Sequence, residues 1–181
     1  MRINDDAWLL VIDPQVIFAD PSSDWAAPRF NDAMAVIAAI APLFGDRVIV
    51  TRWVPAPPYR GSWQAYFKRW TFADRPPDDP VFGLVPGARH LSSFDTVDLP
   101  TFGKWGRRLE SLLGPTPNLV LTGCATDCCV ISTALAAADS GARVRVVADG
   151  CAGSSDENHA AALHLMGLYD PQIKVVRSRQ L

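Results

Sequence analysis

One stretch of the chain decides the fold, residues 118–150: NLVLTGCATDCCVISTALAAADSGARVRVVADG. Its apolar opening predicts a buried strand over residues 118–123, and its Ala-rich middle predicts a helix over residues 129–140 that Gly141 closes. A second apolar strand is predicted over residues 143–150. Strands of this kind, joined by a helix, imply a parallel sheet covered on both faces.

The same alternation of strand and helix runs through the rest of the chain. Further strands are predicted over residues 7–14, 46–53 and 172–178, with a short one near 94–97, and helices over residues 31–44, 105–113 and 156–169. We therefore predict an α/β fold of one domain over residues 1–181: a doubly wound, mainly parallel, six-stranded sheet with helices on both faces.

Composition restricts the classes of partner. The 181 residues are 49% apolar, which is typical of a packed globular protein, and the net charge is −2. Lys and Arg are scattered, so we expect no nucleic acid partner. No apolar run approaches the roughly 20 residues that cross a bilayer, and the start, MRINDDAW, has no signal-peptide pattern. We expect a cytoplasmic protein with a small-molecule substrate and no membrane partner.

A Pro-rich and aromatic segment, residues 54–86, interrupts the alternation. We predict a helix over residues 59–72 within it. This helix either packs on the core or on another subunit, or it forms the wall or lid of a pocket for an apolar or planar ligand. The two interpretations are compatible, and both are kept.

The four cysteines do not form the pattern of a disulfide framework, because three of them crowd into six residues: Cys124, Cys128 and Cys129, with Cys151 apart. No second Cys/His cluster completes a zinc site. We expect no disulfide, no metal and no cofactor.

Two reactive groups follow predicted strands. Asp13 ends the strand over residues 7–14, and Cys129 follows the strand over residues 118–123. Ligands of doubly wound folds bind beyond the carboxyl ends of the strands, so we expect both groups to face one crevice. With Thr126 as N-cap, Cys129 lies in the first helical turn, where the helix dipole favours a thiolate.

Cys128 precedes Cys129 and lies about 100° around an α-helix from it. We therefore expect that the two sulfurs cannot both point at one site. One should be a nucleophile and the other a packing residue, but helix geometry alone does not choose between them.

A resemblance makes that choice. The segment LLVIDPQVIF fits the pattern V-I-D-x-Q-x-x-F, and residues 123–137 fit the pattern G-x-x-T-x-x-C-V-x-x-T-A-x-x-A. With these two segments the chain resembles the isochorismatase-like cysteine hydrolases, which include nicotinamidases and N-carbamoylsarcosine amidase. The cysteine of that family directly precedes valine, so the resemblance implies that Cys129 is the nucleophile.

The resemblance also implies a mechanism. Asp13 would be the general base and acid, and the sulfur would form a thioester with a carbonyl carbon. A non-proline cis peptide at Cys124–Ala125 would turn the N–H of Ala125 to join that of Cys129 as an oxyanion hole.

Substrate contacts are implied for three residues, Gln15, Phe18 and Trp53. Members of the family are usually dimers or tetramers, so we expect a homodimer or homotetramer. Asp149 ends its strand, and we interpret it as a turn or cap residue because Asp13 already supplies the acid.

One departure from the family concerns its lysine, which often stands in K-x-x-Y/F-S-A/G-F. The matching stretch here is LPTFGKW, residues 99–105, which places Leu99 where lysine is expected and Lys104 five positions later. Either Lys104 reaches the site from its shifted position, or the triad is lost and Lys104 is a surface charge. We predict the first.

A second departure concerns metal. Nicotinamidases place D-x-H-x-x-H after the second strand, and the segment TRWVPAPPYRG holds neither Asp nor His. We therefore predict no catalytic metal and disfavour a nicotinamidase. Arg52 and Arg60 remain candidates for a substrate carboxylate, although each could equally be an ordinary exposed arginine.

The favoured hypothesis is thus a metal-independent cysteine hydrolase that cleaves a C–N bond of a small amide or ureido compound. Three alternatives remain. Isochorismatase-type vinyl-ether hydrolysis needs no thiol, so Cys129 argues against it. Leu99 suggests a catalytically impaired binding or assembly protein, and the Cys128–Cys129 pair a redox thiol protein.

Overall fold

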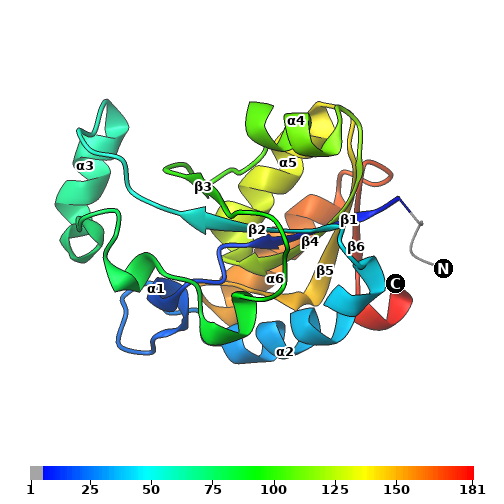
Figure 1. Ribbon diagram of the computed structural model, residues 1–181, viewed down its shortest axis with the longest axis horizontal. Helices are drawn as coiled ribbons and strands as arrows, with labels where there is room; N and C mark the ends of the chain where they lie inside the picture. The colour runs from blue at the N-terminus through cyan, green and yellow to red at the C-terminus, as the bar shows by residue number, and fades with distance from the viewer. Residues whose placement is uncertain (1–5) are drawn as a thin grey trace.

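The computed structural model describes residues 6–181 and contains one six-stranded parallel sheet (Figure 1). Its spatial order is β3-β2-β1-β4-β5-β6, with β1 Trp8–Ile12, β2 Val48–Trp53, β3 Val97–Leu99, β4 Asn118–Cys124, β5 Arg143–Ala152 and β6 Ile173–Val176. The predicted fold class is confirmed. Residues 1–5, where we expected no leader pattern, lie outside the described residues.

The helices are α1 Val16–Ala19, α2 Phe30–Ile40, α3 Ser62–Arg69, α4 Arg107–Leu113, α5 Ile131–Asp139 and α6 Asp156–Gly167. Of these, α2 covers one face of the sheet and α4, α5 and α6 cover the other. Figure 1 shows α4 and α5 on one side of the sheet and α2 on the other. Alternate residues of β1 enter two cores: Leu10 packs with α4, α5 and α6, and Leu9 packs with α2. Burial on both faces explains why β1 is continuously apolar.

Several predicted boundaries need correction. The short strand lies at Val97–Leu99, because it pairs with β2 from Thr51 to Trp53. The aromatic helix spans Ser62–Arg69 rather than residues 59–72, since Gly61, at φ 57°, breaks the helical path before Ser62.

The turn before α5 is also different. Residues 126–130 form a π-helical turn, in which the N–H of Val130 donates to the carbonyl of Ala125 at 3.1 Å. The predicted N-cap Thr126 caps nothing, because its hydroxyl instead contacts His159 Nδ1 at 2.8 Å. The regular helix α5 therefore begins at Ile131.

The strand order reverses between β1 and β4. From β1 the chain proceeds to β2 and β3 at one edge, and from β4 it proceeds to β5 and β6 at the other. The carboxyl ends of β1 and β4 therefore border a crevice, the usual ligand position in such sheets. Gly123, at φ 110°, faces Ile12 so closely that an added Cβ would lie 2.0 Å from the Ile12 oxygen.

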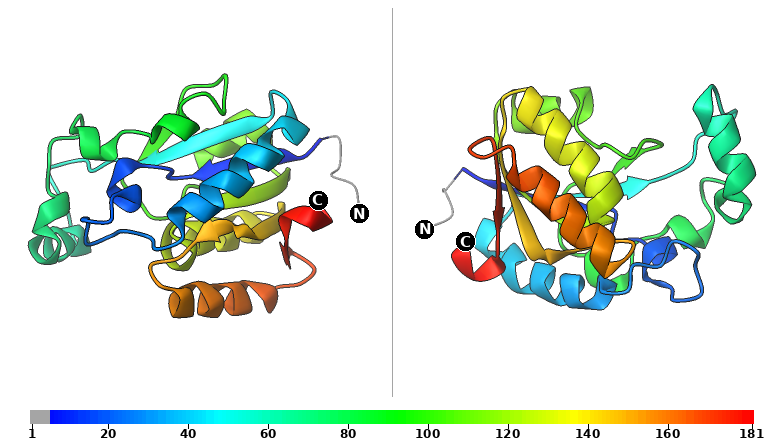
Figure 2. Two further views of the ribbon diagram at one scale, coloured as in Figure 1. Left: turned by 90° about the horizontal axis from the view of Figure 1, so that it is seen from below. Right: turned by 180° about the vertical axis from the view of Figure 1, so that it is seen from behind.

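The helix α3 stands apart from the sheet at the end of a long connection (Figures 1 and 2). It is attached through aromatic rings, because Phe67 stacks on Trp53 at 5.9 Å and on Tyr59 at 3.7 Å between ring centroids. Within this chain, α3 thus packs above the carboxyl end of β2. This agrees with the interpretation that the aromatic helix packs on the core.

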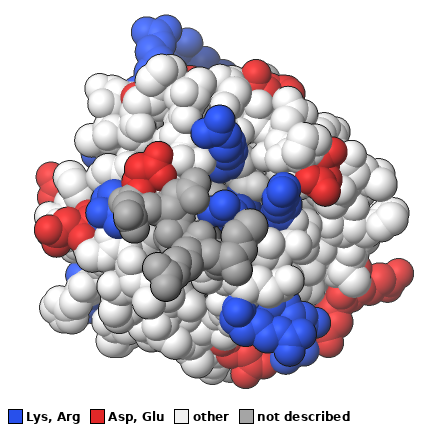
Figure 3. All heavy atoms as spheres, turned by 90° about the vertical axis from the view of Figure 1, so that its right-hand side faces the viewer, with Lys and Arg blue, Asp and Glu red and all other residues white. Residues whose placement is uncertain are grey.

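On the face drawn in Figure 3, acidic and basic side chains are interspersed among uncharged ones. Within residues 6–181, none of the helices has both the length and the apolar character needed to cross a membrane.

The approach of β1 to β4 yields a stability prediction. Gly123→Ala should lower the free energy of unfolding by about 3 kcal/mol or more, since the new methyl group meets backbone and the φ is unfavourable. Gly45→Ala is the matched control: its φ is also positive, at 56°, but no atom lies within 4 Å of the added Cβ. Urea unfolding should give a loss of about 1 kcal/mol there, and equal losses would refute the close-approach argument.

Candidate active site

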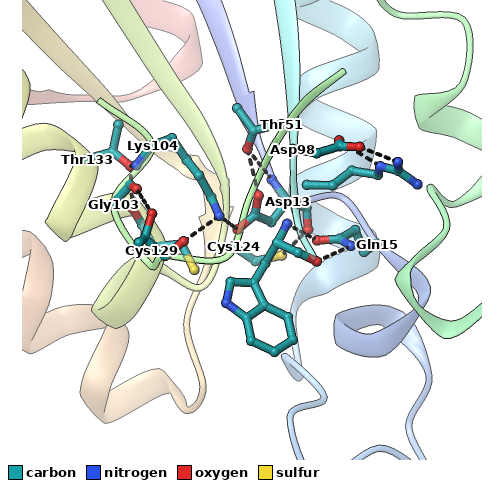
Figure 4. Close-up of polar contacts among 12 residues, drawn as sticks. Asp13, Gln15, Thr51, Asp98, Gly103, Lys104, Cys124, Cys129 and Thr133 are labelled. Atoms are coloured by element: carbon teal, nitrogen blue, oxygen red, sulfur yellow. Dashed lines mark hydrogen bonds and ion pairs between the residues drawn. The ribbon is translucent and has the colours of Figure 1, made fainter. Parts of the chain in front are cut away.

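Asp13 lies just beyond β1 and is fully buried (Figure 4). Its backbone adopts φ 49°, a left-handed conformation that Asp tolerates better than most residues. Thr51, on the neighbouring β2, holds the residue twice: its hydroxyl donates to Asp13 Oδ1 at 2.6 Å and accepts the Asp13 N–H at 3.2 Å. The carboxylate is thus oriented by the adjacent strand.

Lys104 supplies the counter-charge. Its side chain is fully buried, and Nζ lies 3.0 Å from Asp13 Oδ2 while donating to the carbonyl of Thr101 at 2.8 Å. The alternative in which Lys104 is a surface charge is therefore wrong. Leu99, at the position expected for lysine, instead ends β3 and packs against the core.

The loop after β3 explains how Lys104 reaches Asp13 from its shifted position. Gly103 approaches α5 so closely that an added Cβ would lie 3.3 Å from the carbonyl oxygen of Ser132. The backbone N–H of Lys104 then donates to Thr133 Oγ1 at 2.9 Å. Contact with α5 therefore directs the lysine side chain inward.

Thr133 is a positioning residue that the sequence reasoning did not single out. Its hydroxyl accepts the N–H of Lys104 and donates to the carbonyl of Cys129 at 2.6 Å (Figure 4). It therefore ties the lysine loop to the cysteine turn. The available signal was its place four residues after Cys129, about one helical turn away.

Cys129 and Cys128 both line one cavity of about 300 Å³, so the expectation that they cannot share a site is wrong. The reason is the π-helical turn, whose larger number of residues per turn brings successive side chains closer in direction than in an α-helix. Cys129 is 3% exposed and Cys128 is partly exposed. All four cysteines are free thiols.

The surroundings of the Cys129 sulfur disfavour its thiolate. Contact with the Cys128 thiol, burial and the nearby Asp13 carboxylate together raise the pKa of Cys129 well above its ordinary value, and Lys104 opposes this only in part. The hydrogen bond from Cys129 lowers the pKa of Cys128. These contacts oppose the preference for the thiolate that the helix dipole predicts for Cys129.

The predicted substrate contacts divide into two groups. Phe18 and Trp53 line the cavity. Gln15 does not: it is fully buried, and its side-chain amide accepts the N–H of Trp53 at 2.7 Å and donates to the carbonyls of Trp53 and Phe82. Because both ends of this amide are engaged, Gln15 positions Trp53 and does not reach a ligand.

The two arginines proposed for a substrate carboxylate lie elsewhere. Arg52 is paired with Asp98, with Nε 2.9 Å from Oδ1. Arg60 borders a separate hollow between α3 and Pro100. Asp149 accepts the backbone N–H and hydroxyl of Ser178 at 2.8 and 2.7 Å, and so holds a turn as interpreted.

Ala125 and Cys129, the residues of the implied oxyanion hole, both border the cavity, and the Cys124–Ala125 peptide bond is cis. Their role toward a substrate oxygen stays a prediction. Across residues 6–181, His, Cys, Asp and Glu form no group of three or more that could hold a metal ion.

Comparison with the sequence models of known families found a match over almost the whole chain. The sequence model of the isochorismatase domain matches residues 7–179. A search of the curated proteins found no match.

Solved structures share the fold. A cysteine hydrolase from Pseudomonas syringae is 16% identical with a TM-score of 0.82, covering 99% of this chain and 92% of that one. An isochorismatase family protein from Desulfovibrio vulgaris is 21% identical with a TM-score of 0.76, covering 97% and 96%. Pyrazinamidase of Pyrococcus horikoshii, in complex with zinc, is 20% identical with a TM-score of 0.72, covering 95% and 99%. At these identities the likeness concerns the fold alone.

The ion pair yields a prediction on stability. Lys104→Met leaves the Asp13 carboxylate buried without its counter-charge and should lower the free energy of unfolding by about 3–5 kcal/mol. The double variant Asp13→Asn/Lys104→Met should lose less than the sum of the two single variants, by about 1–3 kcal/mol. Urea unfolding of all four proteins measures this coupling, and additive losses would contradict a direct pair.

The thiol chemistry yields a prediction on pH. In a Cys128→Ser background, burial and Asp13 still raise the pKa of Cys129, so iodoacetamide alkylation of Cys129 should be slow at pH 7 and still accelerate above about pH 9. Asp13→Asn removes a negative charge and should speed alkylation at pH 8, whereas Lys104→Met should slow it. Peptide mapping by mass spectrometry identifies the modified cysteine. A rate that levels off below pH 8 would refute the raised pKa.

Proposed function

The chain belongs to the isochorismatase domain family, and from that premise we propose that it is a cysteine hydrolase that cleaves a C–N bond of a small amide or ureido compound through a thioester. One observation carries the proposal. The Cys129 thiol lines the cavity, and the buried pair of Asp13 and Lys104, 3.0 Å apart, lies near enough for both charges to act on that thiol (Figure 4). A thiol, an acid–base carboxylate and a cation are the groups that this chemistry requires.

In the first step, the Cys129 sulfur attacks the carbonyl carbon of the substrate while its proton passes to Asp13. A thiol with a raised pKa depends on such a base to become a nucleophile. The carbonyl oxygen becomes an oxyanion, which the N–H groups of Ala125 and Cys129 would stabilise. The Lys104 ammonium adds positive charge to the same region and keeps the Asp13 carboxylate in place.

In the second step, the C–N bond breaks and Asp13 returns the proton to the leaving nitrogen, which departs as ammonia or an amine. A water molecule then attacks the thioester carbon and gives a proton to Asp13. The C–S bond breaks, the sulfur regains a proton, and the acyl group leaves as a carboxylic or carbamic acid. Asp13 thus serves as base and acid in turn.

Two observations favour this chemistry over two of the three alternatives. Vinyl-ether hydrolysis has no use for a thiol, yet Cys129 borders the cavity. A binding protein that had lost the triad would not need the Asp13–Lys104 pair, since burying two charges usually costs more than their attraction returns.

A screen for ammonia release from small primary amides and ureido compounds tests the proposal. For any compound turned over, Cys129→Ala and Asp13→Asn should each lower kcat/KM by at least about 10²–10⁴-fold. Cys151→Ala is the matched control and should stay within about threefold of the wild type, because Cys151 is also a buried cysteine but does not line the cavity.

Full turnover by Cys129→Ala would refute the assignment of Cys129 as the nucleophile. If the folded wild type turned over no compound although Cys129 still reacted with iodoacetamide, a binding role would replace the hydrolase.

A further inference from the structure

The walls of the cavity that holds Cys129 are mainly aromatic. Six rings contribute to them: Phe18, Trp25, Trp53, Tyr66, Trp70 and Phe102. Trp25 lies at the centre of this group, edge-on to Trp53 at 5.2 Å and to Trp70 at 6.0 Å between ring centroids. Together with a volume of about 300 Å³, these rings indicate a site for a small molecule rather than a polymer.

The charged residues of the same walls are acidic. Asp24 and Asp127 line the cavity, and none of the lining residues is Lys or Arg. Asp127 accepts the backbone N–H and the hydroxyl of Ser154 at 2.8 and 2.7 Å, so it is held in place. Asp24 is exposed and has neither a hydrogen bond nor an ion pair to any residue of the 6–181 range. Its carboxylate is therefore available to a ligand.

Other charges nearby do not offset the negative charge of the cavity walls. Asp13 and Lys104 compensate each other, and neither lines the cavity. The guanidinium of Arg69 lies 5.3 Å from the ring centroid of Trp70, but Arg69 does not line the cavity. A ligand therefore meets aromatic faces and two carboxylates.

A second, independent observation points to a ligand. The indole N–H of Trp53 is buried and has no hydrogen-bond partner within residues 6–181, although Trp53 forms part of the wall. The rings of Trp25, Phe67 and Phe82 pack around the Trp53 ring, so it cannot easily turn to find a partner. A buried donor of this kind is costly unless something accepts from it. An acceptor atom of a ligand would satisfy it only after a small opening of the cavity wall, because the nitrogen exposes less than 1 Å² of surface.

We infer that this cavity takes a cationic small amide, one that carries a quaternary ammonium or protonated amine group besides its amide oxygen. The amide part of this inference rests on the proposed hydrolase function, and the cationic part rests on the residues of the cavity walls. Aromatic faces attract cations through the negative face of the ring, most strongly where water is excluded. The carboxylates of Asp24 and Asp127 add to that attraction, and they repel a substrate carboxylate.

A matched pair of amides tests the inference. 2-(Trimethylammonio)acetamide and 3,3-dimethylbutanamide have nearly the same shape and differ in one atom, a cationic nitrogen against a neutral carbon. Titration calorimetry with the Cys129→Ala protein measures their binding without turnover, and ammonia release measures turnover by the wild type. The cation should bind about tenfold more tightly than its neutral counterpart.

Three variants locate the effect. Asp24→Asn should reduce the preference for the cation by about two- to threefold. Asp78→Asn, at an exposed aspartate that does not line the cavity, is the matched control and should leave it unchanged. Trp53→Phe replaces the indole with a smaller ring that attracts cations less strongly, so it should also reduce the preference for the cation.

Equal binding of the two amides, or tighter binding of the neutral one, would overturn the inference. Its failure is distinguishable from failure of the proposed hydrolase. If the cation binds more tightly but neither amide is hydrolysed, the charge preference stands and the hydrolase proposal loses support. If both amides are hydrolysed and bind with equal affinity, the hydrolase proposal stands and the charge preference is refuted.

Discussion

The structure around the candidate site depends on one buried ion pair, Asp13 with Lys104. Two charges removed from water are tolerated only when other groups satisfy them, and here Thr51 donates to the carboxylate while the carbonyl of Thr101 accepts from the ammonium. These requirements explain local features that are otherwise unrelated. The loop after β3 must turn back onto α5 to bring Lys104 inward, and Asp13 must adopt a left-handed conformation to aim at it.

Residues at the ends of buried strands were predictable from sequence. The continuous apolar runs of β1 and β4 identify central strands, and their carboxyl ends place Asp13 and Cys129 at one crevice. Lys104 was predicted to reach the site although Leu99 stands at the expected position, and the structure brings it to Asp13. Local information, a strand and its end, was enough to place Asp13 and the cysteine turn, whereas the choice of Cys129 and of Lys104 came from the family resemblance.

Residues whose position depends on long-range contacts were not predictable. Gln15 was expected to touch substrate, but it turns inward because Trp53 and Phe82, far away in sequence, offer it backbone partners. Arg52 was a candidate for a substrate carboxylate, but the register of β2 on β3 places it opposite Asp98. The π-helical turn has no signature in the sequence pattern, so the common cavity of Cys128 and Cys129 could not be derived.

The disfavoured Cys129 thiolate and the acidic cavity have a common consequence for a cationic substrate. In the free protein, Asp13 and burial disfavour the thiolate of Cys129. A positive charge bound between the aromatic rings would favour that thiolate, because it offsets the carboxylate field at the sulfur. Binding of a cationic amide would then activate the nucleophile as it positions the carbonyl carbon, whereas an anionic amide would suppress the thiolate further. Selectivity for cationic over anionic amides would thus arise partly from the reactivity of the sulfur and not only from binding affinity. In this way the charge of the cavity walls is connected to the chemistry of the triad.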